Sequence, residues 1–358
     1  MHTCANGDTI VLVRNSADAS PFRSASIKDI ARLAKVSHST VSRALHHSPL
    51  VNPETGDKIR RIAEETGYRR SAVARSLVTR RTDTVGVVVT HIADPFAAEV
   101  VGGIEDAALE RGFSVILANS GGDPDQEVRA VESLEERRVD GIVVTSSRVG
   151  ALYVPMLARM KVPIVLLNNQ HPGDFVHSVM IDNVEASIAV TRHLIEAGHR
   201  RIAYIGDRNG HQSDTERFEG YLTALANADL MFDAGLVAQG DGKPTGAPAA
   251  VERVMAQPQP PTAIFCYNDM TALGVMREVR ARGLKIPDDI SVVGFDDIPF
   301  AEYVDPPLTT IRQPMHEMGR LAMRTLFGLL AGSDSTQNIK VPGELIVRRS
   351  TAAPKETR

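Results

Sequence analysis

Short apolar runs recur along most of this chain, and their spacing limits what it can fold into. Each run is rich in Val and Ile, is apolar almost throughout, and is separated from the next by residues with helical periodicity. Strands of this kind belong in parallel sheets that are covered on both faces. The runs form two series, which predicts two similar α/β lobes. They lie at 84–90, 113–119, 141–146 and 163–168, and then at 201–206, 262–268 and 290–296.

Polar side chains stand at the carboxyl ends of these runs. In open α/β sheets, ligands bind outside the carboxyl ends of the strands. Amides, hydroxyls and carboxylates suit a polyhydroxylated or heterocyclic ligand held between two lobes. The residues in question are Thr90 and His91, Asn119, Thr145 and Ser146, Asn168 and Asn169, Asn268 and Asp269, and Asp296 and Asp297.

The region before residue 68 has a different character and predicts three short helices. Ser26 caps the first helix, with Asp29 in its first turn, and Ser37 caps the second. Asn52 caps the third, whose first residue is Pro53. The connection between the first two helices is tight, which is typical of a helix-turn-helix unit.

The second of these helices has an unusual polar face, in the stretch V-S-H-S-T-V-S-R-A-L at 36–45. Val41, Ala44 and Leu45 share its apolar face. Short hydroxyls and an imidazole can reach phosphates or base edges in a major groove, and Arg43 can offer two donors to guanine. The face contains no acidic residue that would repel phosphates. It is formed by Ser37, His38, Ser39, Thr40, Ser42 and Arg43.

Charge supports a nucleic-acid partner for this region. Residues 22–82 hold 13 Lys and Arg against 5 Asp and Glu, a net charge of +8. The whole chain of 358 residues has a net charge of −4, so the remainder carries −12. A basic head on an acidic body predicts that the head meets a polyanion, although clustering on a solvated face is the alternative.

Several other classes of protein are disfavoured. No apolar run of about 18 residues is present to span a membrane. The apolar segment Thr9–Val13 is too short for a secretory leader, so we expect a cytoplasmic protein. Cys4 and Cys266 lie in unlike contexts, which disfavours a disulfide framework.

Catalytic and cofactor motifs are also missing from the sequence. It has no phosphate-binding loop, no dinucleotide fingerprint and no zinc or calcium ligand spacing. His211, Ser213 and Asp214 fall in one loop without a nucleophile elbow. We therefore expect no enzyme activity, no cofactor and no metal.

Three stretches in order resemble the lactose-repressor (LacI/GalR) family of bacterial transcription regulators. The first is I-K-D-I-A-R-L-A-K-V-S-H-S-T-V-S-R-A-L at 27–45, and the second is S-A-V-A-R-S-L at 71–77. The third combines C-Y-N-D-M-T-A-L-G, V-G-F-D-D and P-P-L-T-T-I-R-Q-P, within 266–314. The resemblance covers residues 26–352.

The resemblance implies a helix-turn-helix DNA-binding head joined to a two-lobed α/β domain like type I periplasmic binding proteins. We expect a disordered extension at 1–25, the head at 26–70, a hinge helix and linker at 71–82, an effector-binding and dimerisation domain at 83–352, and a tail at 353–358. It implies a homodimeric repressor of a carbohydrate operon, released from a pseudo-palindromic operator by a small sugar or sugar derivative. A purine or other corepressor is the alternative, and a solute-binding protein for uptake is a remote one.

The resemblance also implies roles for residues of the head and hinge. His38, Ser39 and Arg43 would read bases, while the neighbouring hydroxyls would hold phosphates or pack. Ala74 and Leu77 would sit in the minor groove, where an apolar wedge can kink DNA at a cost of a few kcal/mol per step.

In the α/β domain, Arg217, Asn268 and Asp296 match the family's ligand clamp. Ser213 and Glu216 have capping-box spacing, which predicts that Arg217 lies in the first turn of a helix. Asn168, Phe96 and Thr145 are further ligand candidates, and Phe96 would either stack on a ring or close its lobe. The competing interpretation makes Arg217 and Asp296 a structural ion pair and the strand-end residues loop caps.

Three features depart from the family pattern. Arg70 stands before Ser71, where the family usually has proline. Gly56 stands where the third helix usually carries a polar or basic residue, so one phosphate contact is expected to weaken. The C-terminus has no heptads, so we expect a dimer and no tetramerising tail.

Overall fold

The computed structural model describes residues 25–68, 81–157, 159–160, 162–170, 177–333 and 337–355. Two compact units meet in the sequence between Arg80 and Arg81, and each is described by itself. The predicted extension therefore lies almost wholly outside the described residues. Ala74 and Leu77 of the predicted hinge also lie outside them.

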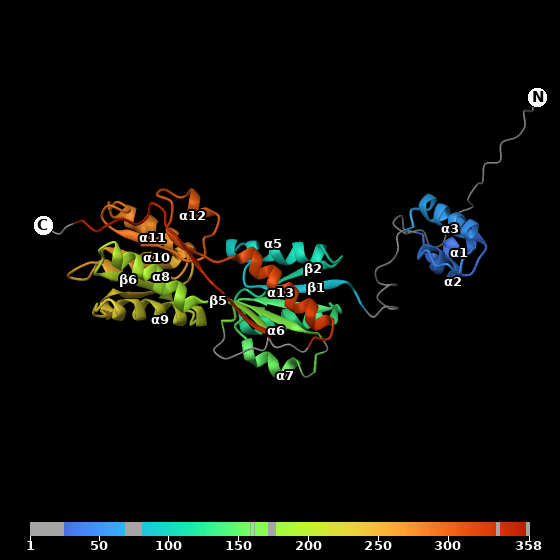
Figure 1. The fold of residues 1–358 in the computed structure, drawn as a ribbon, viewed down its shortest axis with the longest axis horizontal. Coiled ribbons are helices and arrows are strands. Elements are labelled where there is room, and N and C mark those ends of the chain that lie inside the picture. Colours follow the sequence, from blue (N-terminus) through green and yellow to red (C-terminus); the bar gives the residue numbers. More distant parts are fainter. Residues whose placement is uncertain are drawn as a thin grey trace, which may run out of the picture. The chain divides into compact units, whose positions relative to one another are not determined.

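The first unit is a three-helix bundle formed by α1 (Ile27–Ala34), α2 (His38–Leu45) and α3 (Pro53–Glu65) (Figure 1). Ser26 caps α1 in a capping box with Asp29, Ser37 caps α2, and Asn52 caps α3. All three caps were predicted, because short oxygen-bearing side chains satisfy the free N–H groups of a first helical turn. The bundle buries the apolar face of each helix, with Ile30, Val41, Ala44 and Ile59 at most 1% exposed.

The second unit contains two α/β lobes, as the two series of apolar runs predicted. Lobe 1 has a parallel six-stranded sheet in the order β11-β5-β4-β3-β1-β2. Its strands are β1 (Thr84–Val89), β2 (Ser114–Asn119), β3 (Gly141–Thr145), β4 (Ile164–Leu167), β5 (His177–Ile181) and β11 (Gln337–Val341). Its helices are α5 (Pro95–Leu109), α6 (Pro124–Glu136), η1 (Gly150–Tyr153), α7 (Val154–Leu157) and α13 (Met315–Leu330).

Lobe 2 has a parallel four-stranded sheet in the order β7-β6-β8-β9. Its strands are β6 (Ile202–Asp207), β7 (Val237–Gly240), β8 (Ala263–Cys266) and β9 (Ser291–Val293). Its helices are α8 (Asn183–Glu196), α9 (Gln212–Asn227), η2 (Ala234–Leu236), η3 (Pro244–Gly246), α10 (Ala247–Met255), α11 (Asp269–Ala281) and α12 (Phe300–Tyr303).

Helices cover both faces of each sheet over its central strands, which is why β1, β3, β4, β6 and β8 are apolar and almost wholly buried, whereas the edge strand β2 is largely exposed. In β1, Val85, Val87 and Val89 pack with α5 and α13, while Val88 packs in the cluster below α6. In lobe 2, α8 and α9 pack against each other, and α10 and α11 cover a separate cluster that includes Cys266. Successive strand residues alternate between these two cores.

The chain passes between the lobes three times: after β5, before α13 and after β11. Strands β10 (Thr310–Arg312) and β12 (Glu344–Ile346) pair with each other antiparallel, beside these crossings (Figure 1). This arrangement brings segments far apart in sequence, near 168, 182 and 313, to one place. None of the described helices is long and apolar enough to span a lipid bilayer.

Candidate functional site

The polar face of α2 is available to a partner. Ser37, His38, Ser39 and Arg43 are exposed, while Thr40 and Ser42 are half-buried. The Ser37 hydroxyl accepts a hydrogen bond from the Thr40 amide at 3.1 Å, and it lies 2.7 Å and 2.8 Å from the hydroxyls of Ser39 and Thr40. Ser37 and Thr40 therefore build the N-terminus of α2, while His38, Ser39 and Arg43 remain the stronger candidates for base contacts.

Gly56 has a structural role that the sequence did not indicate. It is buried in α3, and a Cβ there would lie 3.2 Å from Nη1 of Arg60. The Arg60 guanidinium lies over this glycine and donates to the carbonyl of Ala44 at 3.2 Å. Gly56 thus makes room for a contact between α3 and α2.

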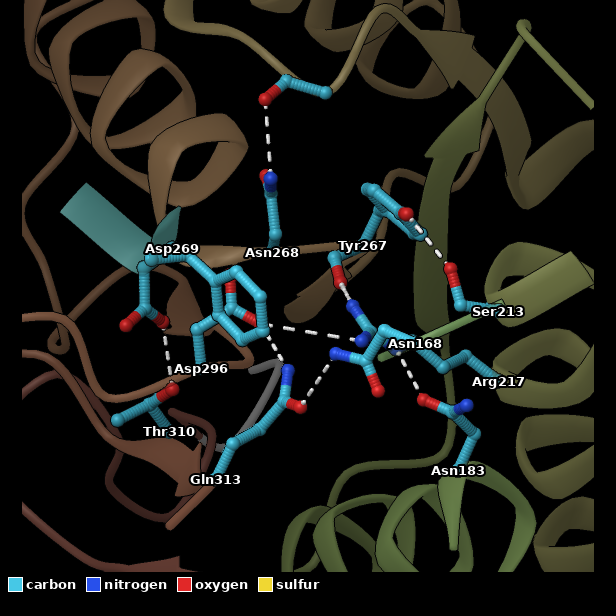
Figure 2. A network of polar contacts seen from close by, with 12 residues as sticks. Asn168, Asn183, Ser213, Arg217, Tyr267, Asn268, Asp269, Asp296, Thr310 and Gln313 are labelled. Atoms are coloured by element: carbon cyan, nitrogen blue, oxygen red, sulfur yellow. Dashed lines mark hydrogen bonds and ion pairs between the residues drawn. The ribbon is translucent and has the colours of Figure 1, made fainter. Parts of the chain in front are cut away.

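In the second unit, Arg217 lies at the centre of a polar network where the lobes meet (Figure 2). Its Nε donates to Oδ1 of Asn183 at 2.9 Å, and its Nη1 donates to the carbonyl of Tyr267 at 2.6 Å. Its guanidinium carbon is 3.6 Å from the ring centroid of Phe295 and 4.8 Å from that of Tyr267. Arg217 is only 4% exposed, so its orientation is fixed before any ligand binds.

The predicted capping box at the start of this helix was wrong. Helix α9 begins at Gln212 with His211 at the cap position, and no side chain caps it. Ser213 instead binds Gln170 of lobe 1, through its amide at 3.1 Å and its hydroxyl at 2.8 Å. Arg217 consequently lies in the second turn of α9 and not in the first, because the helix begins two residues earlier than expected.

Asp296 faces Arg217 at the carboxyl end of the lobe 2 sheet. Its Oδ1 lies 3.9 Å from Nη2 of Arg217 and accepts a hydrogen bond from Gln313 at 2.6 Å. Burial raises the pKa of Asp296 to about 7, because the loss of water outweighs the nearby Arg217 cation. The carboxylate of Asp94, which caps α5 in lobe 1, raises that pKa further.

Asp269 follows the predicted ligand residue Asn268 in the chain, and it supports the loop that carries Asp296. It is fully buried, accepts from the Thr310 hydroxyl at 2.6 Å and accepts from the Ile298 amide at 2.9 Å. Burial raises its pKa well above the usual value for Asp, and the neighbouring Asp296 adds to the rise. Its contacts hold the segment that carries Asp296.

Asn268 acts mainly as a cap in this structure. Its Oδ1 accepts from both the amide and the hydroxyl of Thr271, at 2.9 Å and 2.7 Å, and its Nδ2 donates to the carbonyl of Gly242 at 3.0 Å. An amide nitrogen carries two hydrogens, so one donor of Asn268 remains for a ligand.

The three further candidates from lobe 1 differ in their surroundings. Asn168 lies within the network and donates to Gln313 at 3.3 Å (Figure 2). Thr145 is buried and donates to the carbonyl of Val88 at 3.3 Å, which is a contact within the sheet. Phe96 is 8% exposed and packs in the apolar cluster of lobe 1. Of the three, Asn168 alone is joined to the network by a hydrogen bond between side chains.

Two family models match the chain. Residues 26–71 match the bacterial regulatory proteins of the lacI family, and residues 191–351 match a periplasmic binding protein-like domain. The HTH-type transcriptional repressor PurR of Vibrio atlanticus (strain LGP32) is 35% identical over 328 residues, which cover 91% of this chain and 98% of PurR. This chain belongs to the lacI family.

Solved structures of the family agree over nearly the whole chain. The complex of the transcriptional regulator CelR with cellobiose is 34% identical, with a TM-score of 0.69, and covers 91% of this chain and 99% of its own. The lac repressor dimer bound to operator and the anti-inducer ONPF is 26% identical, with a TM-score of 0.84, and covers 92% and 100%. The predicted family and fold class are confirmed, and the chain is a DNA-binding transcriptional repressor.

For a lacI-family protein, the sequence identified the charged centre of the site but missed its supporting residues. These are Asp94, Gln170, Asn183, Tyr267 and Gln313. Tyr267 and Gln313 lie within the stretches C-Y-N-D-M-T-A-L-G and P-P-L-T-T-I-R-Q-P that carry the resemblance, so position gave some signal for these two. Gln170 and Asn183 had none, because their partners come from distant segments.

Proposed function

We propose that the chain works as a homodimer that binds a pseudo-palindromic operator through α2 and releases it when a neutral sugar binds between lobes 1 and 2. In this scheme residues 26–70 read DNA, residues 71–82 form the hinge with Ala74 and Leu77 at the minor groove, and residues 83–352 bind effector. Because the operator is part of the bacterial chromosome, a protein that binds it would act in the cytoplasm. The observation that best supports this proposal is the polar network around Arg217 and Asp296.

The charges of that network favour a ligand rich in hydroxyl groups. The guanidinium of Arg217 donates to Asn183 and Tyr267, and its Nη2 faces the Asp296 carboxyl group at 3.9 Å, so no separate anion is needed beside its charge. The described contacts of the Asp296 carboxyl group are both on Oδ1, which leaves Oδ2 for a ligand hydroxyl, as an acceptor when ionised and as a donor when it carries the proton. Asp94 adds a second carboxylate. Acceptors of this kind suit sugar hydroxyls and disfavour a phosphate.

Aromatic contacts weigh against a purine as the ligand. The rings of Phe295 and Tyr267 already contact the Arg217 guanidinium, and Phe96 packs into the core of lobe 1. A flat base gains much of its binding energy by stacking on an accessible ring face. CelR, a regulator 34% identical to this chain, was solved with cellobiose. A sugar is therefore our proposal and a purine corepressor the second candidate.

A ligand between the lobes would act by changing how they meet. Polar contacts already join the lobes: Arg148 donates to the Asn209 carbonyl at 2.5 Å, and Gln170 binds Ser213. A sugar that binds the DNA-free arrangement better shifts the population toward it and so acts as an inducer. The shift is limited to the difference between the two affinities.

The effector can be sought by thermal melts of the full-length protein against mono- and disaccharides, sugar phosphates and purine bases. A ligand at about 100 times its Kd stabilises the folded protein by roughly 2.7 kcal/mol. We expect a shift with a neutral sugar that Asp296→Asn abolishes, while Asp125→Asn, an exposed carboxylate on α6, preserves it. A purine shift, or a sugar shift that survives Asp296→Asn, would overturn the proposal for this site.

DNA recognition needs its own test. A duplex selected by the wild-type protein from a random library serves as operator, and a scrambled duplex serves as control. We expect Arg43→Ala to lower the preference for the operator over the scrambled duplex by about 1–3 kcal/mol, the discrimination that one bidentate base contact contributes. An unchanged preference in Arg43→Ala would remove Arg43 from base reading.

A further inference from the structure

Helix α3 contacts the C-terminal ends of both helices of the helix-turn-helix through cations. Lys58 Nζ donates to the carbonyl of Ala34 in the last turn of α1, at 3.5 Å. Arg60 Nη1 donates to the carbonyl of Ala44 in the last turn of α2, at 3.2 Å. The last four carbonyls of a helix lack intrahelical partners and carry partial negative charge, so these ends attract cations.

The Arg60 contact is built rather than incidental. Its Nη2 is held by Oδ1 of Asp57 at 2.5 Å, on the same face of α3. Its guanidinium lies above Gly56, where any larger side chain would compete for the space. The Arg60 side chain is 31% exposed, much less than Arg32, which also pairs with an aspartate three residues away but is 78% exposed.

Ala44 directly follows Arg43, the candidate base-reading residue. The same carbonyl also accepts from the His47 amide at 3.1 Å, where the chain leaves α2. Fixing this carbonyl to α3 fixes the rotation and end point of the last turn of α2. The direction in which Arg43 projects depends on that turn.

We infer that Arg60 is a positioning residue for DNA recognition: it locks the C-terminal turn of α2 against α3, and Gly56 and Asp57 hold its guanidinium for that purpose. Arg60 acts through α2 and not through a DNA phosphate. The inference rests on the DNA-binding function of the head. On this inference, the missing side chain at Gly56 is not simply a lost phosphate contact. It leaves the space on α3 that the Arg60 guanidinium occupies.

The test compares full-length wild type, Arg60→Ala, Arg60→Gln and Arg61→Ala. Arg61 is an exposed arginine one position along α3 and serves as the matched control. The probes are a duplex that wild type selects from a random library and a scrambled duplex, measured by fluorescence anisotropy over a range of salt. If wild type shows no preference between them, the proposed DNA recognition fails and not the role of Arg60.

A positioning role lowers discrimination between the two duplexes without a change in salt dependence. We expect Arg60→Ala to lose about tenfold in preference, the scale of a single charge-assisted hydrogen bond. Gln keeps an N–H donor on a side chain that is two atoms shorter, so Arg60→Gln should recover only a small part of the preference. Arg61→Ala should keep the wild-type preference. A phosphate contact predicts instead an equal loss on both duplexes and a salt slope smaller by about 0.9, with no rescue by Gln. That pattern, or an unchanged preference, overturns the inference.

A second variant covers the case in which Arg60→Ala fails to fold. Leu is a good helix former, and at position 56 its side chain would occupy the space of the guanidinium. We expect Gly56→Leu to retain its helical circular dichroism and to lose preference for the selected duplex. Full preference in a folded Gly56→Leu protein would count against the role of Arg60.

Discussion

Replacing Asp296 by Asn should remove a pH dependence of stability that the buried carboxylate creates. Burial raises the pKa of Asp296 from 3.8 to about 7; Arg217 opposes the rise and Asp94 adds to it. In the unfolded chain, water restores an ordinary pKa near 3.9. Between these two values the folded protein holds a proton that the unfolded chain has released.

The free energy of unfolding must therefore fall as pH rises through this window. Stability falls with pH wherever the native state binds more protons than the unfolded state. One pKa unit corresponds to about 1.4 kcal/mol, so the whole shift amounts to about 4 kcal/mol. Raising the pH from 5.5 to 7 should cost roughly 2 kcal/mol, and little more is lost above that range.

Urea denaturation of wild type and Asp296→Asn at several values between pH 5.5 and 8 measures this effect. His177, His193 and His199 act in the opposite direction, because burial lowers the pKa of each and stability then rises with pH. They are common to both proteins, so their contribution cancels in the difference between wild type and variant. That difference should change by roughly 2 kcal/mol in favour of the variant as the pH rises.

Two parallel stability curves would refute the reasoning. They would mean that Asp296 is ionised throughout the range and that Arg217 neutralises it more strongly than a separation of 3.9 Å implies. The control is Asp125→Asn, which changes an exposed carboxylate and should track wild type. A curve for this control like that of Asp296→Asn would show that the effect does not depend on the buried site.

Three further substitutions test the packing of both units. Ser37→Ala removes the cap of α2 and should cost about 1 kcal/mol, seen as faster amide exchange in that helix; unchanged exchange would contradict the capping role. Gly103→Ala would place a Cβ 1.9 Å from the carbonyl oxygen of His316, where α5 packs against α13, so the free energy of unfolding should fall by roughly 1–3 kcal/mol. An unchanged melting temperature would show that the two helices can move apart without cost. Tyr153→Phe deletes a donor to the buried carboxylate of Glu127 at 2.9 Å and should cost about 1–3 kcal/mol in urea denaturation, with no loss if water replaces the hydroxyl.

The sequence predicted best those features that depend on local residues. Val87 and Val88 pack in different cores because successive residues of a strand point to opposite faces. Hydrogen-bonding chemistry accounts for the helix caps, which are Ser26, Ser37 and Asn52. These patterns depend on residues only a few positions apart. They can therefore be predicted without knowledge of the tertiary contacts.

Features that depend on distant segments were missed or misassigned. Ser213 has the spacing of a capping serine, yet a partner from lobe 1, Gln170, binds both its amide and its hydroxyl. Glu127 on α6 looks like a solvated helix residue, yet it is 1% exposed and accepts from the Arg148 amide and the Tyr153 hydroxyl. Strands β5 and β11 were also missed, since neither was among the apolar runs identified from sequence.

The geometry of Asp296 shows why two separate stretches of sequence must be read together. Its φ of 121° is strained for a residue with a Cβ, and such strain persists only where the surroundings enforce it. In V-G-F-D-D, Gly294 leaves room for the Asp269 carboxylate, because a Cβ there would lie 2.1 Å from Oδ1. In T-T-I-R-Q-P, Thr310 holds Asp269 and Gln313 holds Asp296. Asp269 thus shapes the loop and Asp296 faces Arg217, so the position of the Asp296 carboxyl group depends on both stretches together with Asp269 and Arg217.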